Sequence, residues 1–154
     1  MNKIGLEQNK VNMLSEALNE LLSNYQIFYT NVRGFHWNIK GHKFFELHGK
    51  FEELYNDLQI KIDEIAERVL TLGATPSHIF SDYLKASTIK ETKNIADADG
   101  TVHSILASLE ILLKQQRHLL DLSDHANDEG TNALMSDYIR EQEKLVWMYS
   151  AFNN

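Results

Sequence analysis

An uninterrupted helical repeat between Phe44 and Leu72 constrains this chain more than any other feature. Large apolar residues recur there in steps of three and four, which places them on one face of a single long helix. No proline interrupts the run, and Gly73 followed by Pro76 marks its end. The apolar face consists of Phe44, Leu47, Phe51, Leu54, Leu58, Ile62, Ile65, Val69 and Leu72.

Three further segments carry the same period. Residues 11–35 follow a seven-residue apolar repeat of the kind that helical bundles use. A long connection, 73–93, contains a predicted short helix at 77–86, and two more helices are expected over 94–128 and up to about 152. The predicted fold class is all-α: a four-helix bundle with one long crossover carrying a short extra helix. We expect a single domain over residues 1–154, with a short N-terminal tail at 1–10.

The turns between these helices are also predicted. Gly34 and Gly41 are expected to bracket a turn that holds His36. Gly130 is expected to stop the third long helix, and Thr131 to act as the N-cap of the fourth.

A stripe of metal-ligand residues lies beside the apolar face of the 44–72 helix. At about 100° per residue, His48, Glu52, Asp63 and Glu67 fall within about 100° of one another. With His36 upstream, two imidazoles and three carboxylates suit iron, manganese or zinc. However, His48 and Asp63 are separated by about 22 Å along the helix, whereas metal–ligand bonds are about 2 Å long. One straight helix therefore cannot bring both residues to one metal.

Two interpretations of the stripe remain open at this point. The i, i+4 pairs could be ordinary neighbours on a helix surface. Alternatively, a second copy of the helix runs antiparallel and places Asp63 and Glu67 of one chain against His48 and Glu52 of the other. Such a two-fold contact creates two equivalent sites. A di-iron site inside the bundle is not predicted, because none of the seven histidines has the Glu three residues before it that such sites use.

Several motifs resemble the Dps family, the ferritin-like mini-ferritins of bacteria and archaea. They occur in the family's order as NVRGFHWNIKG at Asn31–Gly41, FFELH at Phe44–His48 and DEIAERV at Asp63–Val69. The segment EKLVWM at Glu143–Met148 is similar to the family's last helix. The resemblance covers about residues 11–152. It implies a ferritin-like bundle, a dodecamer forming a hollow shell, and iron as the bound metal.

The resemblance also implies roles for individual residues. A ferroxidase centre at the two-fold interface would take His36 and His48 from one subunit and Asp63 and Glu67 from its partner. Glu52 falls where related proteins place an acidic ligand or near-ligand. The implied activity is oxidation of Fe²⁺ to Fe³⁺, with hydrogen peroxide as oxidant, followed by storage of ferric mineral and protection against oxidative damage.

Two further sets of residues have alternative interpretations. Trp37 either accepts an oxidising equivalent beside the site or fills the interface, and the frequency of aromatic burial favours packing. Acids between the last two long helices match a family pore that draws Fe²⁺ inward, with Asp124 and Glu129 the best matches; the alternative is a solvated acidic turn. The candidate pore residues are Asp124, Asp128 and Glu129.

Composition limits the other functional classes. The net charge of −7 argues against direct DNA binding, which uses clustered Lys and Arg. The first ten residues contain only Lys3 and Lys10 as basic residues, against Glu7. A DNA-compacting nucleoid protein with a vestigial metal site is therefore the second hypothesis. Absence of cysteine excludes disulfides and thiolate metal sites. No signal peptide or membrane span is predicted, so we expect a cytoplasmic protein.

Overall fold

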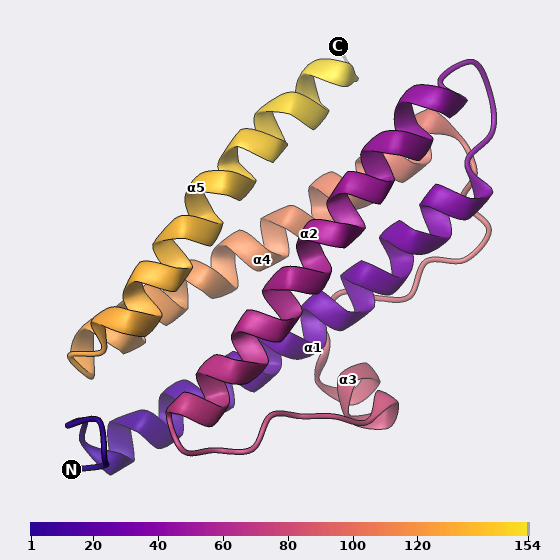
Figure 1. Ribbon diagram of the computed structural model, residues 1–154. Helices are drawn as coiled ribbons and strands as arrows, with labels where there is room; N and C mark the ends of the chain where they lie inside the picture. Colours follow the sequence, from indigo (N-terminus) through magenta and orange to yellow (C-terminus); the bar gives the residue numbers. More distant parts are fainter. Residues whose placement is uncertain (154) are drawn as a thin grey trace.

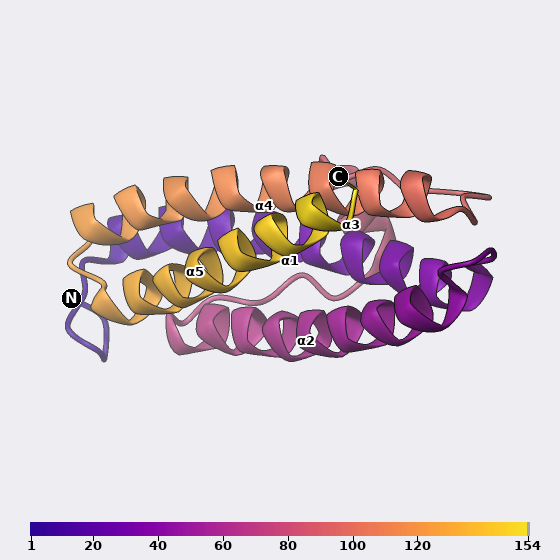
Figure 2. The same cartoon turned by 90° about the horizontal axis from the view of Figure 1, so that it is seen from above.

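The computed structural model describes residues 1–153, which contain five α-helices and no strand. α1 (Gln8–Asn38) and α2 (Phe44–Thr71) run antiparallel, as do α4 (Ala98–His125) and α5 (Glu129–Phe152) (Figure 1). α1 packs against both α2 and α4. The segment after α2 runs along the bundle and carries α3 (Phe80–Ala86), which packs on α1 (Figure 2). The predicted all-α bundle with one long crossover and a short extra helix is confirmed.

The predicted α2 agrees with the structure, whereas the predicted end of α1 is wrong. α1 continues through Gly34 to Asn38, so His36 lies in the last helical turn rather than in a loop. Burial of Val32 and Phe35 holds this end of the helix in place despite the glycine between them. Gly41 does occupy the turn, with a φ of +113° that favours glycine.

The start of α5 also differs from the prediction. Its N-cap is Asp128, whose side chain accepts a hydrogen bond from the Thr131 amide at 3.1 Å. Gly130 therefore lies inside the first turn, where the Arg68 guanidinium packs against it. Arg68 donates to Asp128 Oδ1 at 2.6 Å and, through Nε, to Thr131 Oγ1 at 2.9 Å. The end of α2 is thus bound to the start of α5.

Polar side chains occupy part of the bundle interior. The Tyr25 hydroxyl donates to Gln116, the Gln116 amide to Gln142, and the Gln142 amide back to Tyr25, at 2.5–2.7 Å. Each of these side chains is at most 1% exposed. In this closed ring each side chain donates one hydrogen bond to the next side chain and accepts one from the previous side chain. The ring therefore links α1, α4 and α5 without a buried charge.

A buried ammonium joins α2 to α5 beside that ring. Lys61 is 3% exposed and forms ion pairs with Asp57 at 2.8 Å and Glu141 at 2.7 Å. Burial alone would lower the pKa of Lys61, but its bonds to the two carboxylates raise the pKa above its usual value. None of the helices in residues 1–153 combines the length and apolar composition of a membrane span.

Candidate metal half-sites

The two site histidines are joined by a reciprocal pair of hydrogen bonds. His36 Nδ1 lies 2.6 Å from the His48 carbonyl oxygen, and His48 Nδ1 lies 2.7 Å from the His36 carbonyl oxygen. The two rings stack with centroids 3.8 Å apart and an interplanar angle of 14°. The last turn of α1 supplies one carbonyl and the second turn of α2 the other, so the short 39–43 turn brings the two histidines together.

This geometry determines the tautomer of both rings. A carbonyl oxygen only accepts hydrogen bonds, so each Nδ1 must carry a proton and donate it. In a neutral ring the other nitrogen, Nε2, then has a free lone pair. Backbone carbonyls that accept from one ring nitrogen are the usual means of orienting a histidine for metal binding. The Nδ1 atoms of His36 and His48 are therefore both engaged by carbonyl oxygens, which leaves Nε2 as the ring atom of each that can bind a metal.

Aromatic rings surround this pair. Phe44 stacks on His48 with centroids 5.0 Å apart, and Tyr55 makes an edge contact with His36 at 5.3 Å. His36 is 7% exposed, and His48 is half-buried. The rings restrict the orientation of both imidazoles and keep water away from one side of them.

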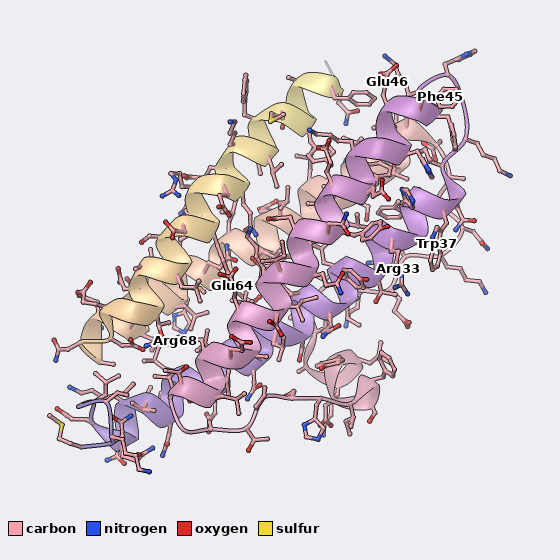
Figure 3. All side chains as sticks on the ribbon, viewed as in Figure 1. Arg33, Trp37, Phe45, Glu46, Glu64 and Arg68 are labelled. Carbon is pink, nitrogen blue, oxygen red and sulfur yellow. The ribbon has the colours of Figure 1, made fainter. Side chains whose placement is uncertain are left out.

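The predicted carboxylate ligands do not join the histidines within one chain. Glu52, Asp63 and Glu67 are all exposed on α2. No group of three or more His, Asp or Glu side chains in residues 1–153 is arranged to hold a metal. Figure 3 shows Phe45 at one end of α2 and Arg68 near the other. His48 lies near the Phe45 end of the helix and Glu67 near the Arg68 end, so the two ends of the stripe are far apart. Within residues 1–153 the predicted imidazole ligands therefore lie apart from the predicted carboxylate ligands, and their role in a metal site stays a prediction.

Trp37 is exposed rather than packed inside the chain. Its side chain is 63% exposed, and the Arg33 guanidinium lies over its ring at 4.8 Å (Figure 3). Arg33 also lies over the Tyr29 ring at 5.3 Å. The exposure of Trp37 in one subunit decides between neither of its predicted roles, and both stay predictions.

The three predicted pore residues fall into two groups. Asp124 and Glu129 are exposed on either side of the α4–α5 turn. Asp128 is only 3% exposed, because its carboxylate caps α5 and pairs with Arg68. Asp128 therefore does not lie on the surface of the subunit, and the prediction that it lines a pore is wrong. Asp124 and Glu129 stay candidates.

The fold defines a class of protein, a ferritin-like bundle, in which a histidine pair joins α1 to α2 and the predicted carboxylate pair lies on α2. A family model described as a ferritin-like domain matches residues 15–154. A crystal structure of a DPS protein from Vibrio cholerae O1, described as a member of a broad superfamily of ferritin-like diiron-carboxylate proteins, is 57% identical. It superposes with a TM-score of 0.99 over 100% of this chain and 97% of that one.

Other relatives with Dps names also match nearly the whole chain. A DNA protection during starvation protein from Porphyromonas gingivalis is 43% identical over 96% of this chain and 93% of its own length. A Dps crystal structure from Bacillus brevis is 33% identical, with a TM-score of 0.93, over 96% of this chain and 99% of that one. The chain belongs to the Dps family of ferritin-like proteins.

Tyr29 and Tyr55 lie beside the histidine pair, and sequence reasoning did not identify either of them. Tyr55 follows His48 by seven residues and Tyr29 precedes His36 by seven, so each tyrosine lies two turns from a histidine on the same helix face. Their rings contact each other with centroids 6.0 Å apart. The seven-residue spacing is the signal that could have identified them.

Proposed function

We propose that this chain is an iron-storage and detoxification ferroxidase of the cytoplasm. It oxidises Fe²⁺ at sites shared by two subunits of a twelve-subunit shell and stores the ferric product inside. The observation that carries this proposal is the reciprocal hydrogen bonding of His36 and His48. It leaves two oriented Nε2 donors with no carboxylate partner in residues 1–153 of their own chain. Such a pair needs ligands from a second copy to hold a metal.

The spacing of the stripe supports an antiparallel second copy. The pairs His48–Glu67 and Glu52–Asp63 have the same midpoint, between Asp57 and Leu58. A two-fold axis at that midpoint sets each histidine end against the carboxylate end of the other copy. Both sites of the pair form from this one register.

The same axis pairs exposed apolar residues with one another. Phe45 and Leu70 are 87% and 58% exposed, and the axis relates them as it relates His48 and Glu67. Ile60, 61% exposed, falls opposite Tyr55 of the second copy. Large apolar side chains exposed along one stripe indicate a surface that a partner covers. The register that completes the sites also buries these side chains.

The mixed ligand set suits the proposed reaction. Neutral imidazole from His36 and His48 binds Fe²⁺, and the carboxylates of Asp63 and Glu67 favour Fe³⁺, the harder ion. Glu52 adds a further oxygen beside His48. Two Fe²⁺ supply the two electrons that reduce one H₂O₂, and two protons are taken up to complete two molecules of water. Coupling these electrons limits the formation of hydroxyl radical.

Asp124 and Glu129 are proposed to draw Fe²⁺ into the shell at a three-fold pore. Both are exposed at the α4–α5 turn, and a ring of three such pairs would concentrate cations. Asp128 contributes instead to holding that turn against α2.

The double substitution His48→Ala with Asp63→Ala tests the site. We expect the shell to assemble, because neither side chain belongs to the core, but peroxide-dependent Fe²⁺ oxidation on the sized assembly should be severely slowed. The matched control is His103→Ala with Asp99→Ala, two exposed α4 residues outside the stripe, which should oxidise Fe²⁺ like the parent protein. Unchanged kinetics in the first variant would eliminate the proposed site.

A DNA-compacting protein is the second candidate, because relatives carry the name DNA protection during starvation protein. The N-terminal segment offers little for this role: Lys10 is paired with Glu7 at 3.3 Å, which leaves Lys3. No Lys or Arg follows Lys144. A gel-shift titration at low salt, with and without Mg²⁺, separates the two functions. Tight binding without divalent metal would overturn our preference.

A further inference from the structure

Two tyrosines extend the aromatic contacts of the histidine pair along the contact between α1 and α2. The Tyr55 ring lies edge-on to His36 at 5.3 Å, with an interplanar angle of 69°. Tyr29 lies edge-on to Tyr55 at 6.0 Å and 83°. The sequence of contacts therefore runs from His36 on α1 through Tyr55 on α2 to Tyr29 on α1.

Both tyrosines are half-buried, and Arg33 fixes the second of them. Its guanidinium donates to the Tyr29 hydroxyl at 3.2 Å and lies over the Tyr29 ring at 5.3 Å. Packing alone does not require phenols at these positions, since phenylalanine fills other half-buried positions of the same bundle, as Phe44 and Phe152 do. Phenol differs from phenyl in being readily oxidised by one electron.

The proposed site needs a one-electron donor whenever it holds only one Fe²⁺. Reducing H₂O₂ to water takes two electrons, whereas a site holding a single Fe²⁺ supplies one. The chain contains no cysteine, so tyrosine and tryptophan are its main one-electron donors. A donor in contact with a ligand ring could supply the second electron before hydroxyl radical escapes.

We propose that Tyr55, backed by Tyr29, is the electron donor that completes peroxide reduction when only one Fe²⁺ is bound. The inference rests on the proposed ferroxidase function. The step is Fe²⁺ + H₂O₂ + TyrOH + H⁺ → Fe³⁺ + TyrO• + 2 H₂O. Iron and the phenol each lose one electron, the O–O bond breaks, and the phenol proton together with one solvent proton completes the two waters. Tyr29 then exchanges the radical with Tyr55 through their ring contact.

Arg33 favours the tyrosines over Trp37 as the site of the radical. Oxidation of an indole first produces a radical cation, and the Arg33 guanidinium lies 4.8 Å from the Trp37 ring. Two positive charges at that distance repel each other. A phenol loses its proton on oxidation, so the resulting radical is neutral and carries no such penalty. Trp37 is therefore not the electron donor.

Freeze-quench EPR on the assembled protein tests the inference. The protein is loaded with less than one Fe²⁺ per proposed site and mixed with H₂O₂. We expect a tyrosyl signal whose hyperfine pattern narrows when the chain is made with ring-deuterated tyrosine. Tyr55→Phe should lose the signal and release more hydroxyl radical to a spin trap. The control Tyr149→Phe should keep the parent signal, because that phenol is buried without a hydrogen-bond partner in residues 1–153, between α2 and α5.

The outcomes are distinguishable. A parent protein that does not oxidise Fe²⁺ at all would refute the proposed function itself. Normal Fe²⁺ oxidation without a tyrosyl signal, or a signal that persists in Tyr55→Phe, would overturn the electron-donor role alone. Peptide mass spectrometry on the peroxide-treated parent protein needs no variant to fold: oxidation products should fall on the peptides containing Tyr55 and Tyr29. Products on Trp37 instead would refute the assignment.

Discussion

Replacing Arg68 with alanine should destabilise the subunit strongly, although Arg68 is not a proposed metal ligand. Its guanidinium holds the Asp128 carboxylate at 2.6 Å and the Thr131 hydroxyl at 2.9 Å. The side chain of Asp128 is 2% exposed, so Arg68→Ala leaves a buried carboxylate without its counter-ion. The perturbation therefore removes one partner of a buried pair rather than a surface contact.

The magnitude follows from what Asp128 retains. Breaking a buried ion pair from one side costs about 3–5 kcal/mol. Asp128 keeps the Thr131 amide at 3.1 Å and the Thr131 hydroxyl at 2.5 Å, and it caps the positive end of the α5 dipole. These bonds place the loss at the lower end of that range, about 3 kcal/mol. Asp128→Asn keeps a competent cap and should cost less.

Urea unfolding at one fixed protein concentration measures the change, because assembly makes stability depend on concentration. The double variant Arg68→Ala with Asp128→Asn should lose less than the sum of the single losses, by about 1–2 kcal/mol. The matched control is Arg140→Ala, which breaks an exposed pair with Asp137 and should change the free energy of unfolding by no more than about 0.5 kcal/mol. Additive losses, or an Arg68→Ala effect as small as the control's, would refute the buried-pair argument.

Two further predictions concern glycine and pH. Gly34→Ala should stabilise by up to about 1 kcal/mol, because Gly34 is inside α1 and its added methyl group meets nothing within 4 Å. Gly41→Ala should destabilise by about 1–2 kcal/mol, because its φ of +113° strains other residues; thermal unfolding compares the two, and equal effects would contradict the reasoning. Burial raises the pKa of both Tyr25 and Tyr149. The contribution of these two buried phenols to the free energy of unfolding is fully present below the ordinary tyrosine pKa of about 10. Above that pH the tyrosines of the unfolded chain lose their phenol protons while the folded chain keeps them, so the contribution decreases. The urea midpoint should therefore fall as pH rises beyond that value, and a flat profile would argue against buried phenols.

The sequence predicts those features that depend on helical period. The bounds of α2 and the placement of His48, Glu52, Asp63 and Glu67 on one stripe follow from spacing alone, and so does the impossibility of a site within one helix. These are properties of a regular helix, which needs no knowledge of its neighbours.

Features decided by contacts between helices were not predictable. Asp128 and Thr131 are both acceptable N-caps by type, and the choice of Asp128 depends on Arg68, which is distant in sequence. The glycine at position 34 indicated a turn, but burial of its neighbours extends α1 to Asn38. The reciprocal bonds between His36 and His48 depend on how closely two helix ends approach, which no local pattern encodes.

Complementation between two inactive variants tests the central claim most directly. One variant carries His36→Ala with His48→Ala, and the other carries Asp63→Ala with Glu67→Ala. Each alone should fail to oxidise Fe²⁺. When the two are co-assembled in equal amounts, half of the two-fold pairs are mixed and each mixed pair has one intact site, so about a quarter of the parent activity should return. A site completed within one chain would remain broken in both variants, so the absence of restored activity would contradict the shared-site account.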